Sequence, residues 1–170
     1  DNVELNLSPF EQQFAEQRQF FTEGVDLFSK GNLFYSRRVG DRPSLTPETD
    51  DDEEIVDFPD KVQLINAVKI SGRTKKGLGI GFFNAITEKT LATIEQTELI
   101  DENTSNAATT KSKRDTVVEP LANYNIMVLD QQFNKNSSVT LINTNVTRYG
   151  RFKDANVTGL LLDFVNKKNT

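Results

Sequence analysis

The chain has 170 residues, of which 36% are hydrophobic and 26% are charged, and its formal net charge is −5. This length allows one domain with a core, and the composition is too apolar for a disordered chain. The sequence contains neither Cys nor His, which excludes disulfides, thiolate metal sites and Ser-His-Asp catalysis. We expect no metal and no cofactor, and the absence of a basic stripe argues against nucleic acid as a partner.

The N-terminal residues are predicted to form a short helix followed by a joint segment. The helix begins at the run "SPFE", where Ser8 can cap it and Glu11 completes a capping box. Gly24 provides its end. Residues 32–39, "NLFYSRRV", mix apolar and polar residues with many β-formers, and we expect them to be extended. The first residue is Asp1 and not Met, which indicates a piece of a longer chain.

The stretch 41–60 is strongly acidic, with nine acidic residues against one arginine. It is predicted to be an exposed, mobile loop, because its apolar content is too low to offset the entropy of ordering. The run "DDDEE" at 50–54 is a candidate calcium site, because calcium favours clustered carboxylates. It lacks the alternating aspartates and the distal glutamate of a calcium loop, so we interpret it as a solvated loop without a metal.

From residue 61 to residue 170 apolar and polar residues alternate with period two, which predicts β-strands. Turns are predicted at "TKKG" (74–77), at "NKNS" (134–137) and near Gly150, and a long polar loop at 97–116. This gives about five consecutive antiparallel strands. The predicted fold class is all-β and antiparallel, with a short N-terminal helix and long polar loops. No stretch of ~18 apolar residues is present, which excludes a transmembrane helix.

The predicted strands have one apolar face and one face of small or polar residues. In "GLGIGFFNAIT", Ile80 and Phe82 share one face, and the other face is expected to carry Gly77, Gly79 and Gly81. In the last strand Leu160 lies opposite Gly159. The apolar face can cover the core of a soluble sheet or contact lipid in a membrane barrel, and alternation with period two fits both. Short turns that alternate with a long loop favour the barrel. Since closed barrels start at ~8 strands, the chain would be a segment of a larger barrel.

The candidate site combines Arg18, Arg37 and Arg38 with Glu16 and Glu23. Guanidinium groups suit planar oxyanions, so the cluster could bind an anion or a glycan carboxylate. We favour a structural ion-pair cluster that fixes the Phe-rich segment against the barrel wall, because a charged group away from water is normally paired. Glycosidase chemistry needs two carboxylates that face a cleft, and no pair is singled out, so no catalytic residue is expected.

The run "FEQQFAEQRQFFTEGVDLFSKGNLFYSRRVGDRP" resembles a signature of a large Bacteroidota-type family of outer-membrane proteins. Three later blocks resemble the same family in the same order: "AVKISGRTKKGLGIGFFNAIT", "VEPLANYNIMVLDQQF" and "SSVTLINTNVTR". The chain departs from the signature with Gln17 in place of Lys and Gln19 in place of Pro. The matching positions of the first run are Phe14, Glu16, Arg18, Phe20, Phe21, Glu23, Gly24, Phe28, Leu33, Phe34, Tyr35, Ser36, Arg37, Arg38, Gly40 and Pro43.

The resemblance implies the C-terminal β-barrel-like domain of unknown function that follows a family-9-type carbohydrate-binding module in such proteins. On this basis we expect a non-enzymatic β-barrel segment in the outer membrane of a Gram-negative bacterium, within a surface protein linked to carbohydrate or nutrient binding and uptake. Its partner would be outer-membrane lipid, and glycans would bind through the module absent from this chain. The alternative is a soluble carbohydrate-binding or carbohydrate-active (glycoside hydrolase-associated) β-domain.

The expected organisation has three parts. Residues 1–40 form the Phe- and Arg-rich helix and joint segment, and residues 41–60 form the acidic loop. Residues 61–170 form antiparallel strands that are part of a larger barrel.

Overall fold

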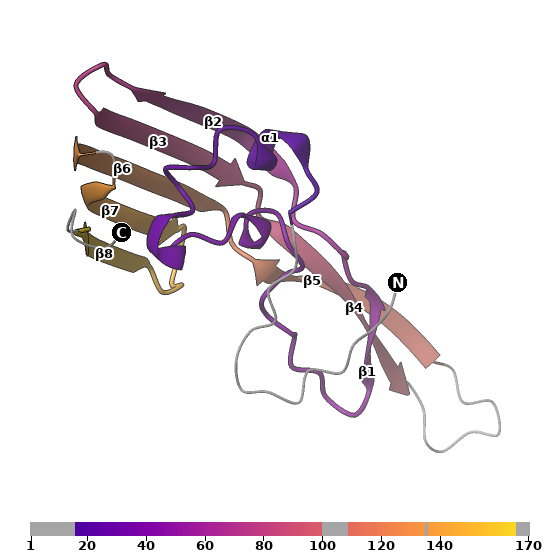
Figure 1. The fold of residues 1–170 in the computed structure, drawn as a ribbon. Coiled ribbons are helices and arrows are strands. Elements are labelled where there is room, and N and C mark those ends of the chain that lie inside the picture. The colour runs from indigo at the N-terminus through magenta and orange to yellow at the C-terminus, as the bar shows by residue number, and fades with distance from the viewer. Residues whose placement is uncertain (1–15, 100–108, 135, 166–170) are drawn as a thin grey trace.

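The computed structural model describes residues 16–99, 109–134 and 136–165. These residues form eight β-strands in two antiparallel sheets, together with one short α-helix and two short 3-10 helices. The predicted all-β, antiparallel class is confirmed. The two sheets lie end to end and do not close into a barrel (Figure 1).

The large sheet has the strand order β2-β3-β6-β7-β8, and the small sheet has the order β1-β4-β5. Every neighbouring pair is antiparallel, as expected for strands joined by turns. The strands of the large sheet are β2 (Leu64–Arg73), β3 (Leu78–Thr87), β6 (Ala122–Asn134), β7 (Ser137–Arg148) and β8 (Ala155–Asp163). Those of the small sheet are β1 (Glu53–Asp57), β4 (Thr90–Leu99) and β5 (Thr109–Glu119).

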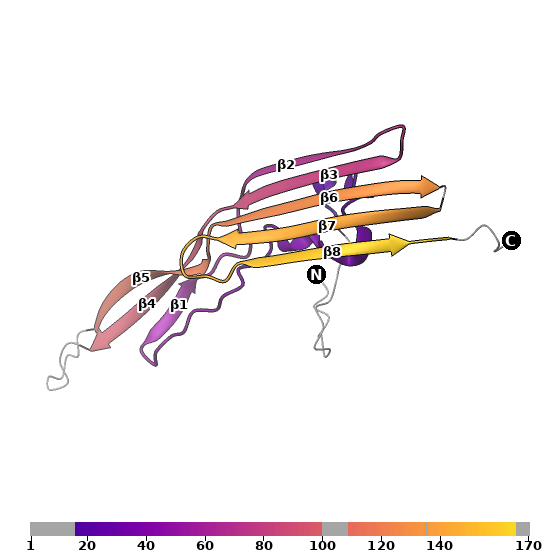
Figure 2. The ribbon, with the colours of Figure 1, turned by 90° about the vertical axis from the view of Figure 1, so that its left-hand side faces the viewer.

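One long, bent hairpin joins the two sheets. β3 continues into β4 after Glu88 and Lys89, and β5 continues into β6 after Pro120 and Leu121. β3 pairs with β6 and β4 pairs with β5, so both arms are interrupted at the same level. Pro120 has no N–H to donate to a ladder, which explains why β5 and β6 are separate strands. Figure 2 shows the small sheet projecting from one end of the large sheet.

The predicted turns lie where the strands reverse. In the β2–β3 turn the N–H of Gly77 donates to the carbonyl of Thr74 at 3.0 Å, and Gly77 has φ +84. That left-handed conformation strains any side chain, so glycine is needed for the turn itself rather than for an interior face. β6 ends at Asn134 and β7 begins at Ser137, as the turn at 134–137 predicts. Gly150, with φ +100, lies between β7 and β8.

The polar stretch 97–116, predicted as a loop, is largely strand. β4 reaches Leu99 and β5 begins at Thr109, and residues 100–108 lie outside the described part of the chain. The acidic stretch 41–60 contains β1, which pairs with β4. The described residues therefore form eight strands and not about five. Few large apolar residues are present in these strands, so their sequences show no apolar–polar alternation, and cross-strand polar pairs support them instead.

The described part of the N-terminal region, residues 16–40, contains less regular structure than predicted. The helix α1 covers only Gln19–Thr22, and the predicted helix start at residues 8–11 lies outside the described residues. The stretch 32–39, predicted as extended, contains the 3-10 helix Ser36–Arg38 and the last residue of the 3-10 helix Lys30–Asn32, so that prediction is wrong. None of the described strands pairs with this stretch, and the packing of its side chains on the large sheet sets its path. Among the described residues, no helix is long and apolar enough to cross a membrane.

Candidate functional site

Residues 16–40, here called the N-terminal segment, cover one face of the large sheet, here called the inner face (Figures 1 and 2). Glycines on this face allow close contact. A Cβ added to Gly79 would lie 2.9 Å from the side chain of Leu27, and one added to Gly81 would lie 3.1 Å from that of Phe28. Gly159 of β8 is covered as closely by the same segment. The predicted inward position of these three glycines is confirmed.

Phenylalanine side chains form the apolar contact between the N-terminal segment and the inner face. Phe83 of β3 is 1% exposed and lies at the centre of this cluster. The ring of Phe34 has its centroid 5.1 Å from that of Phe83, and the ring of Phe21 lies at 5.9 Å. Phe20 and Phe28 each lie at 6.4 Å. The tilted and edge-on geometries are those that aromatic rings prefer.

Ion pairs at a buried carboxylate also attach the N-terminal segment to the large sheet. Asp130 of β6 is 0% exposed and lies on the inner face. Its Oδ1 accepts a hydrogen bond from Nζ of Lys30 at 2.5 Å and one from the hydroxyl of Thr140 at 2.6 Å. Its Oδ2 accepts a bond from the guanidinium of Arg73 at 2.5 Å. The bonds from Lys30, Thr140 and Arg73 compensate the cost of burying this carboxylate.

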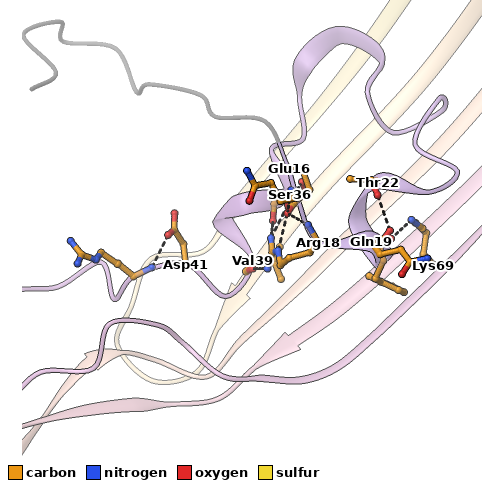
Figure 3. A network of polar contacts seen from close by, with 11 residues as sticks. Glu16, Arg18, Gln19, Thr22, Ser36, Val39, Asp41 and Lys69 are labelled. Atoms are coloured by element: carbon orange, nitrogen blue, oxygen red, sulfur yellow. Dashed lines mark hydrogen bonds and ion pairs between the residues drawn. The ribbon is translucent and has the colours of Figure 1, made fainter. Parts of the chain in front are cut away.

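A second ion pair organises the start of the segment (Figure 3). The guanidinium of Arg18 donates to both carboxylate oxygens of Glu16, at 2.9 and 2.8 Å. It also donates to the carbonyls of Val39 at 2.6 Å and Ser36 at 3.0 Å, and so joins the two ends of the segment. Hydrogen bonding from Arg18, assisted by the hydroxyl of Ser36, lowers the pKa of Glu16 to about 2. Arg18 also lies 4.0 Å over the ring of Phe21.

The other predicted site residues lie on the same segment with different contacts. The carboxylate of Glu23 accepts a hydrogen bond from the amide of Gln19 at 2.9 Å, and its backbone carbonyl accepts one from Lys69 of β2. Arg37 lines a cavity of about 470 Å³ beside the ion pair described above. The guanidinium of Arg38 lies 6.0 Å from the ring centroid of Tyr35. The structure thus brings Glu16 and Arg18 together, whereas the carboxylate of Glu23 bonds to a neutral amide.

A further cavity, of about 360 Å³, lies between the N-terminal segment and the inner face. Its lining is mainly apolar and aromatic, with a carboxylate and an ammonium group among it. The residues that carry these features are Phe21, Phe28, Phe34, Phe83, Glu16 and Lys69.

The acidic run at 50–54 takes part in strand pairing. Asp52 accepts a hydrogen bond from the amide of Gln96 at 2.8 Å, and Glu53 accepts two from the guanidinium of Arg114, at 2.9 and 2.8 Å. The bonds from Arg114 lower the pKa of Glu53. In the described part of the chain, no group of three or more His, Cys, Asp or Glu side chains could hold a metal ion.

The face of the large sheet opposite the N-terminal segment, here called the outer face, is apolar and uncovered. Ile70 is 64% exposed and Leu160 is 63% exposed, although both lie within regular strands. The alternation predicted for Ile80, Phe82 and Leu160 on one face, with glycines on the other, is confirmed. Other exposed apolar side chains of these strands are Leu64, Ile65, Val68, Ile80, Phe82, Met127, Phe133, Leu141, Val157 and Leu162.

Sequence reasoning missed the buried ion-pair group of Lys30, Arg73 and Asp130. A signal was present: Asp130 has the same parity as Val128, so it is a charged residue in an inward position of a strand. Its partners could not be assigned from the pattern, because Lys30 is separated from it by 100 residues and Arg73 by 57.

We expect the N-terminal segment to loosen as the pH falls from about 4 to about 2. In the folded chain Glu16 has a pKa of about 2, below its ordinary value of 4.5. A lowered pKa contributes stability that is present above the ordinary value and is lost as the pH falls through the folded value. Denaturant midpoints measured from pH 6 to pH 2 would test this, and an equal acid loss in Glu16→Gln would contradict it.

Comparison with known proteins identifies a family for this chain. Neither a search of curated proteins nor a search of solved structures found a similar protein. The family model that is described as "Domain of unknown function (DUF5916)" matches residues 1–170, the whole chain. The chain therefore belongs to the DUF5916 family of domains of unknown function.

Proposed function

We propose that these residues are a non-enzymatic segment of an outer-membrane β-barrel, in a surface protein linked to carbohydrate or nutrient binding and uptake. The host would be a Gram-negative bacterium of the Bacteroidota type. The observation that carries the proposal is the contrast between the two faces of the large sheet. Its outer face is apolar and exposed, and its inner face holds the charged groups and is covered by the N-terminal segment.

The outer face has the character of a lipid-contacting surface. Monomeric soluble proteins rarely expose contiguous apolar patches larger than a few hundred Å², because such patches drive association. Lipid chains would cover the side chains of Ile70, Met127 and Leu160 without that penalty. The charged groups Asp130 and Lys30 lie on the inner face, away from the position where a Lys or Arg facing lipid costs about 2–4 kcal/mol at the bilayer midplane.

The size of the large sheet supports a segment and not a complete barrel. The sheet has five strands, with β2 and β8 at its edges, whereas closed barrels start at about eight. Strands outside the described residues would complete the barrel. An edge left open in lipid would leave a row of backbone N–H and C=O groups unsatisfied, at several kcal/mol each.

The link to carbohydrate or nutrients rests on the resemblance of the opening run, from Phe14 to Pro43, and of the later blocks. Glycan binding is assigned to an N-terminal module that these residues do not contain. The non-enzymatic part of the proposal is supported by the use of carboxylates in structure: Asp130 and Glu16 bind cations, and Glu119 accepts hydrogen bonds from Ser44 at 2.8 and 2.5 Å.

Fractionation of the intact protein in its native host tests the proposal. We expect the protein in the outer-membrane fraction, resistant to extraction with alkali and urea and released by detergent, because the outer face needs an apolar phase. A periplasmic enzyme and a resident outer-membrane protein serve as the two reference markers. Recovery in the soluble fraction would overturn the proposal and favour the soluble carbohydrate-binding β-domain.

A further inference from the structure

The apolar part of the outer face ends at a border on the side of the small sheet. Toward that side each strand passes from an apolar to a polar outward side chain. The pairs are Val68 and Asn66, Phe82 and Asn84, Met127 and Asn125, Leu141 and Asn143, and Leu160 and Thr158. Beyond the border, Ile86 near the end of β3 is apolar again, and Ile65 of β2, in the irregular register between Leu64 and Asn66, is apolar and exposed. We call the polar residues Asn84, Asn123, Asn125, Asn143, Asn145, Asn156 and Thr158 the amide belt.

Members of the amide belt bond to one another across the strands. The amide nitrogen of Asn84 donates to the side-chain oxygens of Asn123 at 2.7 Å and Asn125 at 2.8 Å. The amide nitrogen of Asn143 donates to Asn156 at 3.1 Å and to the hydroxyl of Thr158 at 2.7 Å. The remaining donors and acceptors of these groups need water or headgroups, because an unsatisfied amide in hydrocarbon costs several kcal/mol.

The border crosses the sheet obliquely. Leu160 of β8 lies in one hydrogen-bonded row with Leu141, Leu129, Ile80 and Gly72. On β2, however, the last apolar residue is Val68, four residues from Gly72. Four residues are about 13 Å along a strand, and the four spacings from β2 to β8 are about 19 Å, which gives a slant of about 35°. Strands of membrane barrels incline by about 35–45° to the barrel axis.

A flat boundary between lipid and water explains this slant. Strands that are inclined to the membrane meet such a boundary at a different residue on each strand, and the shift has one direction across the sheet. A border perpendicular to the strands would instead place Val68 and Asn156 in the same environment, because they lie in one row through Asn84, Asn125 and Asn145.

The two ends of the large sheet differ in their connections. At one end are the turn of residues 74–77 and the short connection between Asn134 and Ser137. At the other end are residues 88–121, which carry β4 and β5, and residues 149–154 (Figure 2). Outer-membrane barrels have short periplasmic turns and longer extracellular loops. The amide belt lies on the side of the long connections.

We propose that the amide belt marks the extracellular border of the lipid that contacts this sheet, and that the small sheet stands outside the membrane on the cell surface. This inference rests on the proposed function and adds to it a partner for each part of the outer face. Lipid chains contact the apolar residues of the outer face, across the sheet from Val68 on β2 to Leu160 on β8. Headgroups and water contact the amide belt. The polar strands β4 and β5 then need no apolar cover.

Spin labels at Val68→Cys and Asn156→Cys in the intact, membrane-inserted protein test the border. These 170 residues contain no Cys, so each variant carries one thiol in this region. We expect a ratio of oxygen to nickel-complex accessibility several-fold higher at Val68 than at Asn156, although both lie in one row. Leu160→Cys is the matched reference and should resemble Val68. Equal ratios at Val68 and Asn156 would overturn the oblique border, whereas absence of the protein from the membrane would overturn the proposed function.

Labelling of intact cells with a membrane-impermeant maleimide tests the orientation. We expect Ser112→Cys of β5 to react in intact cells, and Lys75→Cys of the β2–β3 turn to react only after the outer membrane is opened. Both positions are exposed in the structure, so a difference between them reports the side of the membrane. The reverse pattern, or equal labelling of both positions in intact cells, would overturn the orientation even if the protein is found in the membrane.

Discussion

Replacing Asp130 by Asn is expected to lower the free energy of unfolding by about 3–5 kcal/mol, the usual effect of removing one partner of a buried ion pair. The carboxylate of Asp130 is fully buried, and Lys30 and Arg73 each approach it at 2.5 Å. In the variant two cations would face each other across a neutral amide. Denaturant midpoints of the intact protein in detergent, and the amount of assembled protein, measure the effect.

The matched control is Asp163→Asn, which removes the same charge from an exposed position on β8. Surface changes of this kind are usually within about 0.5 kcal/mol. Lys30→Arg, which keeps the cation, should lose less stability than Lys30→Gln. If Asp130→Asn and Asp163→Asn have the same midpoint, the ion pairs do not hold the N-terminal segment.

Replacing Gly79 by Val is expected to destabilise the fold by about 1–3 kcal/mol, as overpacking of a well-filled interior does. A Cβ at this position would lie 2.9 Å from the side chain of Leu27 and 3.1 Å from the guanidinium of Arg73. The extra methyl groups would displace the N-terminal segment and weaken the bond between Arg73 and Asp130. The denaturant midpoint and the protease sensitivity of the bond after Arg18 report the two effects.

Two substitutions on the same hairpin are matched controls. A Cβ at Gly72 meets nothing within 4 Å, so Gly72→Val should be neutral or slightly stabilising, because valine favours strands more than glycine does. Ile80→Val removes one methylene from an exposed apolar side chain and should be nearly neutral. Equal tolerance at Gly72 and Gly79 would show that the inner face is not filled by the segment.

The arrangement of the large sheet could be predicted from the sequence to a considerable extent. Period-two alternation assigned the strands around Ile80 and Leu160 and their two faces, because side chains of a strand point alternately to its two sides. The turn of residues 74–77 followed from its glycine and polar residues. These features depend on residues that are close in the sequence, so the sequence alone predicts them.

The small sheet could not be predicted in the same way. Its strands β4 and β5 carry few large apolar side chains, and their stability depends on partners such as Arg114 and Glu53, which are 61 residues apart. Likewise, the path of residues 32–39 follows from side-chain packing on the sheet and not from local propensity. In both regions the determining contacts are formed between distant parts of the chain.

The candidate site shows the same division. The sequence by itself indicated a structural cluster of Phe- and Arg-rich residues near the N-terminus. It also placed glycines on the strand face opposite the apolar residues. Only the tertiary structure decided that Lys30 meets Asp130, that Arg18 bridges Glu16 to the end of the segment, and that the outer border is oblique. A residue's charge and parity are local properties, but the partner that neutralises a buried charge is set by how the N-terminal segment folds back onto strands far along the chain.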